Sequence, residues 1–227
     1  MAIERRPLRE QIREELMLRL DRGDFAAGTD INEAALAGEL GVSRTPLREA
    51  LITLAGEGVL ESNQGRGFRF APVSRKEFRE LCAIVAALEA LALENSNPAY
   101  LEEIAPELLR LAQDFSDNIA ERQDIERHDD EWHDLLLSGC TNERLLDLIT
   151  SVKAGMRRYA HLMTGESTPM ERAAEEHCRV AECLIAGDRK GAAAALRDNW
   201  VNGMERMMAR IPSEEAQAAG RASARRG

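Results

Sequence analysis

Four residues in the C-terminal half of the chain have side chains that bind metal ions. Asp129 and His133 are four residues apart in a helical pattern, so they share one helix face. His177 lies ten residues before Gly187, and Asn199 lies twelve after it. If Gly187 turns an antiparallel helical hairpin, His177 and Asn199 reach nearly the same height. Converging inside a bundle, these residues would supply nitrogen and oxygen ligands to a divalent metal.

The same residues also fit a plainer interpretation. His133 follows Trp132 and precedes three leucines, which is typical of an ordinary, partly buried histidine. Asp129 lies among four other acidic residues between positions 124 and 131, which is typical of a solvated helix face. Spacing alone leaves the metal site and the packing role both open.

A second group of residues has the chemistry of DNA recognition. Arg44 and Arg48 are one helical turn apart on a segment that begins at Ser43, with Thr45 between them. Their side chains point away from the apolar face of that segment. They and the N-terminus of the helix are therefore available to phosphates or base edges.

Residues 31–54 predict the elements that would present these arginines. Apolar side chains recur at spacings of three and four: Leu36 and Leu40 on a first helix, then Leu47, Ala50, Leu51 and Leu54 on a second. Gly41 suits the left-handed conformation that ends a helix, and Ser43 is a good N-cap. The pattern is typical of a helix-turn-helix, so binding to double-stranded DNA is the first hypothesis.

A β-hairpin is predicted directly after these helices, over residues 59–72. Phe68 and Phe70 alternate with Arg69, and the turn before them is rich in glycine. A basic hairpin in this position is typical of a wing, with Arg66 and Gly67 at its tip entering a minor groove or touching phosphate. The alternative is a solvated hairpin on a small unrelated domain.

The rest of the chain predicts an all-α bundle. Helices follow one another from about Ser74 to Ile211, with breaks near residues 95–98, 114–118, 138–139, 165–169 and 187–188. The predicted fold class is therefore mostly α, with an N-terminal winged helix-turn-helix over 1–72 and a helical bundle of six or seven helices over 73–212. Residues 213–227 are small and polar, which predicts a disordered tail.

Composition limits the classes of protein that remain. No apolar run approaches the roughly 18 residues that span a bilayer, so no membrane partner is expected. The four scattered cysteines lack metal-site spacing and favour reduced thiols in the cytoplasm. Of the net charge of −10, residues 1–75 carry −1 and the remainder −9. An acidic C-terminal domain would suppress non-specific DNA affinity and leave recognition to a few arginines.

Residues 7–72 resemble the winged helix of the GntR family of bacterial transcription regulators. The resemblance rests on the Gly28 and Ile31-Asn32-Glu33 lead-in, the run from Leu36 to Leu51, and the Gly65-Arg66-Gly67 wing. It implies that Ser43, Arg44, Thr45 and Arg48 face DNA, that the wing tip adds contacts, and that a homodimer binds a short inverted repeat. Ala34 departs from the pattern, because some relatives carry a DNA-contacting arginine there.

Residues 74–211 resemble the FCD-type ligand-binding domain found in one branch of that family. The match covers the Asp129–His133 stretch, the Ser138–Asn142 stretch, Glu176-His177 and Ala186-Gly187-Asp188. It implies a divalent metal (zinc, nickel or manganese) at the base of an effector pocket, held by Asp129, His133, His177 and Asn199. Asn199 stands where the family has a third histidine, and its amide oxygen is a weaker ligand than imidazole.

A further departure concerns the effector. Many relatives carry an arginine where this chain has Val85, so a carboxylate effector must be held in another way. Arg157, Arg158 and Tyr159, on a helix expected over residues 142–163, are candidates. A solvated surface is the alternative interpretation of these three residues.

The leading hypothesis is therefore a dimeric regulator, most often a repressor in this family, that a small organic or sugar acid releases from DNA. One rival is a metal-dependent hydrolase or lyase, although no general base, phosphate loop or nucleophile elbow is evident. A second rival is an architectural DNA binder whose C-terminal domain only dimerises.

Overall fold

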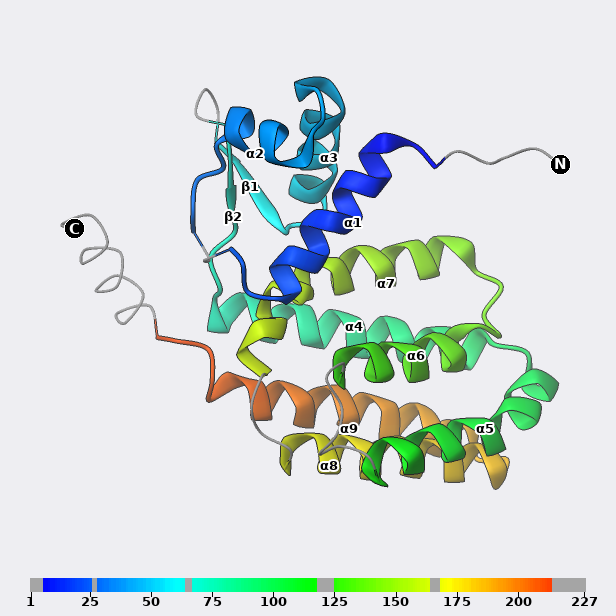
Figure 1. Ribbon diagram of the computed structural model, residues 1–227. Helices are drawn as coiled ribbons and strands as arrows, with labels where there is room; N and C mark the ends of the chain where they lie inside the picture. Colours follow the sequence, from blue (N-terminus) through cyan, green and yellow to red (C-terminus); the bar gives the residue numbers. More distant parts are fainter. Residues whose placement is uncertain (1–5, 26–27, 64–66, 118–124, 164–167, 214–227) are drawn as a thin grey trace, which may run out of the picture. The chain divides into compact units, whose positions relative to one another are not determined.

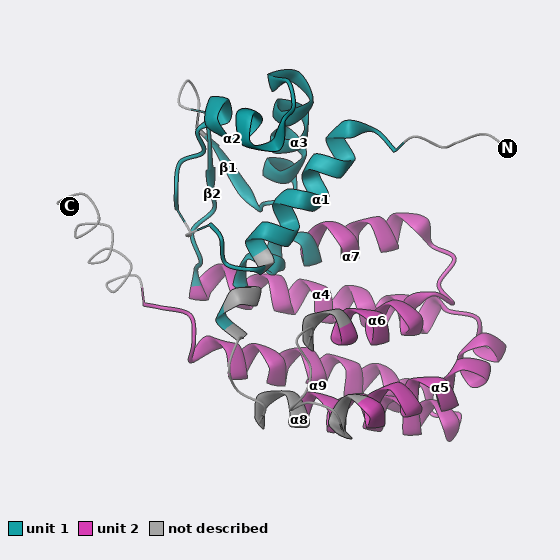
Figure 2. Ribbon diagram, viewed as in Figure 1, with its two compact units in different colours: residues 1–74, 153–162 teal, residues 75–152, 163–227 magenta. Residues whose placement is uncertain are grey.

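A computed structural model describes residues 6–25, 28–63, 67–117, 125–163 and 168–213 (Figure 1). The chain divides into two compact units (Figure 2). Unit 1 comprises residues 1–74 together with 153–162, and unit 2 comprises residues 75–152 and 163–227. The return of residues 153–162 to unit 1 was not predicted, because the helical pattern of the sequence places them in the C-terminal bundle.

Unit 1 contains the predicted helix-turn-helix and wing. Its elements are α1 (Leu8–Asp21), α2 (Glu33–Leu40), α3 (Arg44–Gly56), β1 (Leu60–Asn63) and β2 (Gly67–Phe70). The amide oxygen of Asn32 accepts hydrogen bonds from two backbone N–H groups and caps α2. Gly41 ends α2 with a φ of 65°, as expected. Ser43 occupies the N-cap of α3 with extended backbone, but its side chain makes no capping hydrogen bond.

The wing is an antiparallel hairpin that a third segment extends. Leu60 pairs with Phe70, and the register continues to Asn63 and Gly67. Residues 28–31 run along the other edge of β2, where Ile31 N donates to Phe68 O at 2.8 Å. This pairing was not predicted from the sequence. It ties the segment before α2 to the wing, so that the helix-turn-helix and the hairpin form one body.

The core of unit 1 lies between α1, α3 and the hairpin. Four α3 residues at helical spacing are fully buried: Leu47, Ala50, Leu51 and Leu54. They pack with Ile12 and Leu16 of α1 and with Phe68 and Phe70 of the wing. Burial of these side chains stabilises the unit by about 1.5–3 kcal/mol for each large aliphatic residue. One face of α3 is therefore committed to the core.

Unit 2 is helical throughout its described elements, so the predicted mostly α fold class is confirmed. Its helices are α4 (Arg75–Asn95), α5 (Pro98–Asp117), α6 (Ile125–Leu137), most of α7 (Glu143–Met156), α8 (Thr168–Ile185) and α9 (Arg189–Met208). The closest packing joins α5 with α8, α4 with α9, and α8 with α9. The expected helix over residues 142–163 changes at Met156 into a 3₁₀ helix, Arg157–Met163.

The α8–α9 hairpin turns where the sequence predicts. Gly187 has a φ of 74°, and Asp188 caps α9 by accepting a hydrogen bond from Gly191 N at 2.9 Å. The two helices pack along their length, and side chains of Glu176 and Asn199 meet across them. Among the described residues, no helix is both long and apolar enough to cross a membrane.

Candidate DNA-binding face and metal cluster

The predicted DNA-contacting residues lie on the solvent side of α3. Ser43, Arg44, Thr45 and Arg48 are all exposed, whereas Leu47 between them is fully buried. This arrangement follows from the helical period, since residues that share the core stripe cannot share the outer one. The outer stripe thus presents two guanidinium groups and two hydroxyl groups from the first turns of one helix.

Arg48 is exposed but not unconstrained. Its side chain is 62% exposed, and its Nη1 lies 3.4 Å from Oε2 of Glu33 at the start of α2. Its guanidinium carbon lies 6.0 Å from the centroid of the Phe68 ring in the wing. These loose contacts bring α2, α3 and β2 together at one arginine and aim it outward.

The wing tip is only partly described. Gly67 has a φ of 83°, which favours glycine, and a Cβ there would lie 3.3 Å from Glu33 Oε1. Arg66, predicted to enter a minor groove, lies outside the described residues. The structure therefore brings Gly67 beside Glu33 near the recognition helix.

Three of the four predicted metal ligands converge in unit 2. Asp129 and His133 come from α6 and His177 from α8, and one donor atom of each lies within 4.8 Å of the others. Nε2 of His177 is 3.5 Å from Oδ1 of Asp129, and Nε2 of His133 is 4.0 Å from Oδ2. Both histidines are 1% exposed, and the Asp129 side chain is 35% exposed.

This donor set fits a divalent transition metal. Two imidazole nitrogens and one carboxylate oxygen are ligands that zinc, nickel and manganese accept. Both imidazoles direct Nε2 to the same carboxylate, which is an arrangement that a shared cation would stabilise. The Asp129 side chain is only partly buried, so this carboxylate is the member of the set that remains accessible to solvent.

Asn199, the fourth predicted ligand, is buried in α9 beside the same region. Its Nδ2 donates to Oε2 of Glu176 at 3.0 Å, and Glu176 immediately precedes His177. A carboxylate only accepts hydrogen bonds, so the amide nitrogen faces Glu176 and Oδ1 is the atom that Asn199 can offer to a metal. Arg206 holds the same carboxylate through two bonds of 2.8 and 2.9 Å.

Three residues around the cluster were not singled out from the sequence. Glu89 of α4 is fully buried, and its Oε2 lies 2.8 Å from His133 Nδ1 and 2.7 Å from Trp200 Nε1. Trp132 stacks on the His177 ring, with centroids 4.0 Å apart. A signal for Glu89 was available, because it is the only charged residue between positions 81 and 93.

The proposed effector residues have a different position from the one expected. Arg158 and Tyr159 are buried in the part of unit 1 that the 3₁₀ helix supplies, whereas Arg157 is exposed. Arg158 donates to the carbonyl of Gly58, and the Tyr159 hydroxyl bonds the backbone of Ser74 at 3.1 and 3.2 Å. These contacts give Arg158 Nη1 and the Tyr159 hydroxyl a structural role within unit 1, and a role of the two residues in holding an effector stays a prediction.

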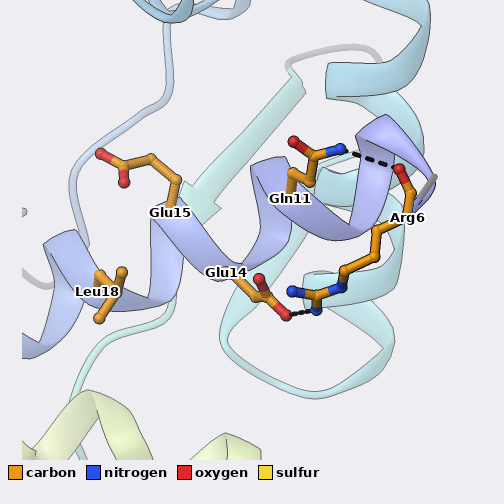
Figure 3. Close-up of a pocket in the computed structure, with 5 residues that line it drawn as sticks. All are labelled: Arg6, Gln11, Glu14, Glu15 and Leu18. Carbon is orange, nitrogen blue, oxygen red and sulfur yellow. Dashed lines mark hydrogen bonds and ion pairs between the residues drawn. The ribbon is translucent and has the colours of Figure 1, made fainter. Parts of the chain in front are cut away.

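A hollow beside α1 has no apparent part in either site (Figure 3). It is lined by Arg6, Gln11, Glu14, Glu15 and Leu18, and Arg6 pairs with Glu14. That bond raises the pKa of Arg6. With two carboxylates beside one guanidinium, the hollow does not have the charge of a phosphate-binding surface.

The cysteines are not candidates for metal binding. None of the four forms a disulfide, and Cys82 and Cys140 are buried. Burial raises the pKa of the Cys82 thiol to about 12, so it stays protonated at neutral pH.

Comparisons with known proteins cover both units. Residues 8–70 match the model of bacterial regulatory proteins of the gntR family, and residues 77–202 match the FCD domain. The chain is 34% identical to the Nta operon transcriptional regulator of Aminobacter aminovorans, over 73% of this chain and 77% of that protein. It is 28% identical to a probable D-xylose utilization operon transcriptional repressor of Paenarthrobacter nicotinovorans, over 82% of each chain.

The fold is also found among solved structures. The E. coli protein McbR/YncC superposes with a TM-score of 0.70 and 23% identity, covering 91% of this chain and 98% of that one. At this identity the likeness concerns the fold alone. The matched families and the named relatives are transcription regulators and not enzymes.

Proposed function

This chain belongs to the gntR family of bacterial regulatory proteins and carries an FCD domain, and from this premise we propose that it is a repressor released from DNA by a small acid. The observation that carries the proposal is the pairing of two sites on one chain. Unit 1 has an exposed Arg44/Arg48 stripe on a packed recognition helix, and unit 2 has an Asp-His-His cluster whose two histidines are buried.

For DNA, we propose that α3 enters the major groove with Ser43, Arg44, Thr45 and Arg48 toward the bases and backbone. Arg66 and Gly67 of the wing would add a contact beside it. One recognition helix covers a single half-site, so a homodimer with twofold symmetry would read an inverted repeat. Because its partner is bacterial DNA, the protein would act in the cytoplasm.

For the effector domain, we propose that Asp129, His133, His177 and the Oδ1 of Asn199 hold a divalent metal. A metal there would supply positive charge and an open coordination position for a carboxylate. Residues at the cluster itself carry carboxylates, so a bare cluster would repel an acid that the loaded one attracts. The effector class that fits is therefore a small organic or sugar acid.

The name of one relative supports the direction of regulation. A protein 28% identical to this chain is described as a probable repressor of a D-xylose utilization operon. We propose that this chain is also a repressor. Effector binding would favour an arrangement of the two winged helices that no longer matches both half-sites. The ligand controls DNA affinity only as far as it distinguishes the two arrangements.

The proposal is tested by selecting bound sequences from a random DNA pool with the full chain. We expect an inverted repeat, and we expect some members of a panel of organic and sugar acids to weaken its binding at least tenfold when zinc is present. A bound sequence without symmetry would contradict the dimeric arrangement. An affinity that no acid changes would favour an architectural DNA binder.

Elemental analysis of protein purified without a metal-affinity tag or chelator tests the metal separately. About one equivalent of zinc, nickel or manganese per chain is expected. Absence of metal even after soaking in divalent ions would remove the site and return Asp129, His133 and His177 to a packing role.

A further inference from the structure

Glu89 is a carboxylate placed where a carboxylate is costly. It is 0% exposed, on α4, in an otherwise uncharged stretch of thirteen residues. Removing a carboxylate from water costs several kcal/mol unless hydrogen bonds and charges compensate it. Part of its compensation comes from α6 and α9, through His133 Nδ1 at 2.8 Å and Trp200 Nε1 at 2.7 Å. Glu89 therefore links α4 to α6 and α9 through contacts with His133 and Trp200, and a buried carboxylate in this position is expected to have a function.

The direction of these hydrogen bonds determines which histidine nitrogen carries a proton. The indole Nε1–H only donates, so Oε2 of Glu89 accepts from Trp200. The same oxygen lies 2.8 Å from His133 Nδ1, and because an ionised carboxylate can only accept, Nδ1 is the donor and carries the proton. In the neutral ring the lone pair is then on Nε2, the nitrogen 4.0 Å from Asp129 Oδ2.

We infer that Glu89 is the positioning residue that makes His133 a metal ligand, by holding the Nδ1–H tautomer and aiming Nε2 into the cluster. The inference rests on the metal site proposed above and names a residue outside its ligand set. A carboxylate in this position also increases the basicity of the ring that it holds, which strengthens the bond from Nε2 to a metal.

The chain contains its own reporters of this arrangement. It has two tryptophans, and both contact the cluster. Trp132 stacks on His177 with an interplanar angle of 9°, and Trp200 bonds Glu89 with its ring 5.2 Å from that of His133. Intrinsic fluorescence therefore follows events at the cluster and has no tryptophan background from the DNA-binding unit.

The experiment titrates the full-length, metal-stripped chain with Zn²⁺ by tryptophan fluorescence and calorimetry, and with Co²⁺ by visible absorption. Glu89→Gln removes the charge with little change in shape. Glu94→Gln is the matched control, since Glu94 is exposed on the same helix and pairs with Arg197. We expect the dissociation constant for Zn²⁺ to rise about 10- to 100-fold in Glu89→Gln and to stay unchanged in the control. The Co²⁺ absorption band of Glu89→Gln should also shift.

The outcomes separate the inference from the metal site. If Glu89→Gln binds both ions like the wild type, the inference is overturned and the metal site stands. If the wild type binds neither ion, both are overturned. A purely structural role would lower the melting temperature of the metal-free variant and leave its metal affinity unchanged, which also overturns the inference.

A second measurement needs no variant. The ¹⁵N shifts of the His133 ring in metal-free wild type, at a pH where the ring is neutral, report the protonated nitrogen directly. A proton on Nδ1 is expected. A proton on Nε2 would overturn the inference even if Glu89→Gln failed to fold.

Discussion

At the scale of single residues, the two candidate sites differ in the exposure of their side chains. Arg48 is exposed and held by weak contacts to Glu33 and Phe68, so it is available to a partner at little cost. His133 and His177 are buried, and their rings are held by Glu89 and Trp132. Substitution of the exposed Arg48 should therefore change DNA binding without changing stability. Substitution within the Asp129, His133 and His177 cluster tests which side chains bind the metal.

Arg48→Ala should weaken binding to the selected inverted repeat far more than binding to random DNA. A bidentate arginine–guanine contact contributes about 1–3 kcal/mol to base discrimination, which corresponds to roughly 5- to 150-fold in affinity. Fluorescence anisotropy with both DNAs measures the ratio. Arg197→Ala, in unit 2, is the control and should change neither affinity. Equal losses on both DNAs would mean that Arg48 touches only phosphate.

Asn199→His should tighten binding of zinc, because imidazole nitrogen is a stronger ligand than an amide oxygen. We expect at least a tenfold lower dissociation constant in a competition titration with a chelator. Asn202→His is the matched control, since Asn202 is exposed and bonds the same Glu176 carboxylate. An affinity that rises equally in both variants, or in neither, would show that position 199 is not a ligand position.

At the scale of elements, backbone conformation at one turn positions the recognition helix. Gly41 has a φ of 65°, and a Cβ there would have no neighbouring atom within 4 Å, so a side chain at this position is strained without being crowded. Gly41→Ala should lower the free energy of unfolding by about 1–2 kcal/mol. Urea unfolding measures the change.

Gly38 provides the matched comparison inside α2. A Cβ there also meets nothing within 4 Å, but its φ is not positive. Gly38→Ala should therefore stabilise the chain by up to about 1 kcal/mol. The same sign of change in both variants would argue that the left-handed turn between α2 and α3 is not the source of the strain.

The 3₁₀ helix has a stability role that can be separated from effector binding. The Tyr159 hydroxyl contacts the backbone of Ser74 and Arg158 Nη2. Tyr159→Phe should lower the free energy of unfolding by about 1 kcal/mol or more, since it leaves buried polar groups with one bond fewer. Binding of the identified acid, measured by calorimetry, should not change. Loss of acid binding at unaltered stability would restore Tyr159 as an effector residue.

At the scale of the whole molecule, the distribution of charge and the proposed homodimer both bear on how DNA would be recognised. Residues 1–75 are nearly neutral and the remainder carries −9, so little general attraction to DNA is expected outside the recognition surface. Each chain offers one α3. A single recognition helix with little general attraction to DNA binds more tightly when two copies are joined at a fixed spacing. The spacing also fixes the distance between the two half-sites.

Sedimentation equilibrium of the full chain at micromolar concentration should therefore give about twice the chain mass of 25.2 kDa. The dimer should persist at high salt if apolar burial holds it, because screening weakens mainly exposed charge pairs. A monomer at concentrations that saturate the inverted repeat would contradict the proposed mode of binding.

The amino-acid sequence by itself determined the parts of this protein that depend on local pattern. The helix-turn-helix is continuous in sequence from Glu33 to Gly56. Spacings of three and four indicate its two helices and the exposure of Arg48, and Gly41 indicates the turn between them. The α8–α9 hairpin follows in the same way from Gly187 and Asp188. Spacing also placed Asp129 and His133 on one helix face and predicted that His177 meets them, and the family resemblance favoured a metal site there.

Only the tertiary structure decided which distant segments meet. Glu89 reaches His133 across 44 residues, residues 28–31 pair with β2, and Arg158 and Tyr159 join unit 1 although they follow a helix of unit 2. No local period encodes such contacts, because they depend on how whole faces pack. The sequence therefore specified which side chains could recognise DNA or a metal, and packing decided which neighbours orient them.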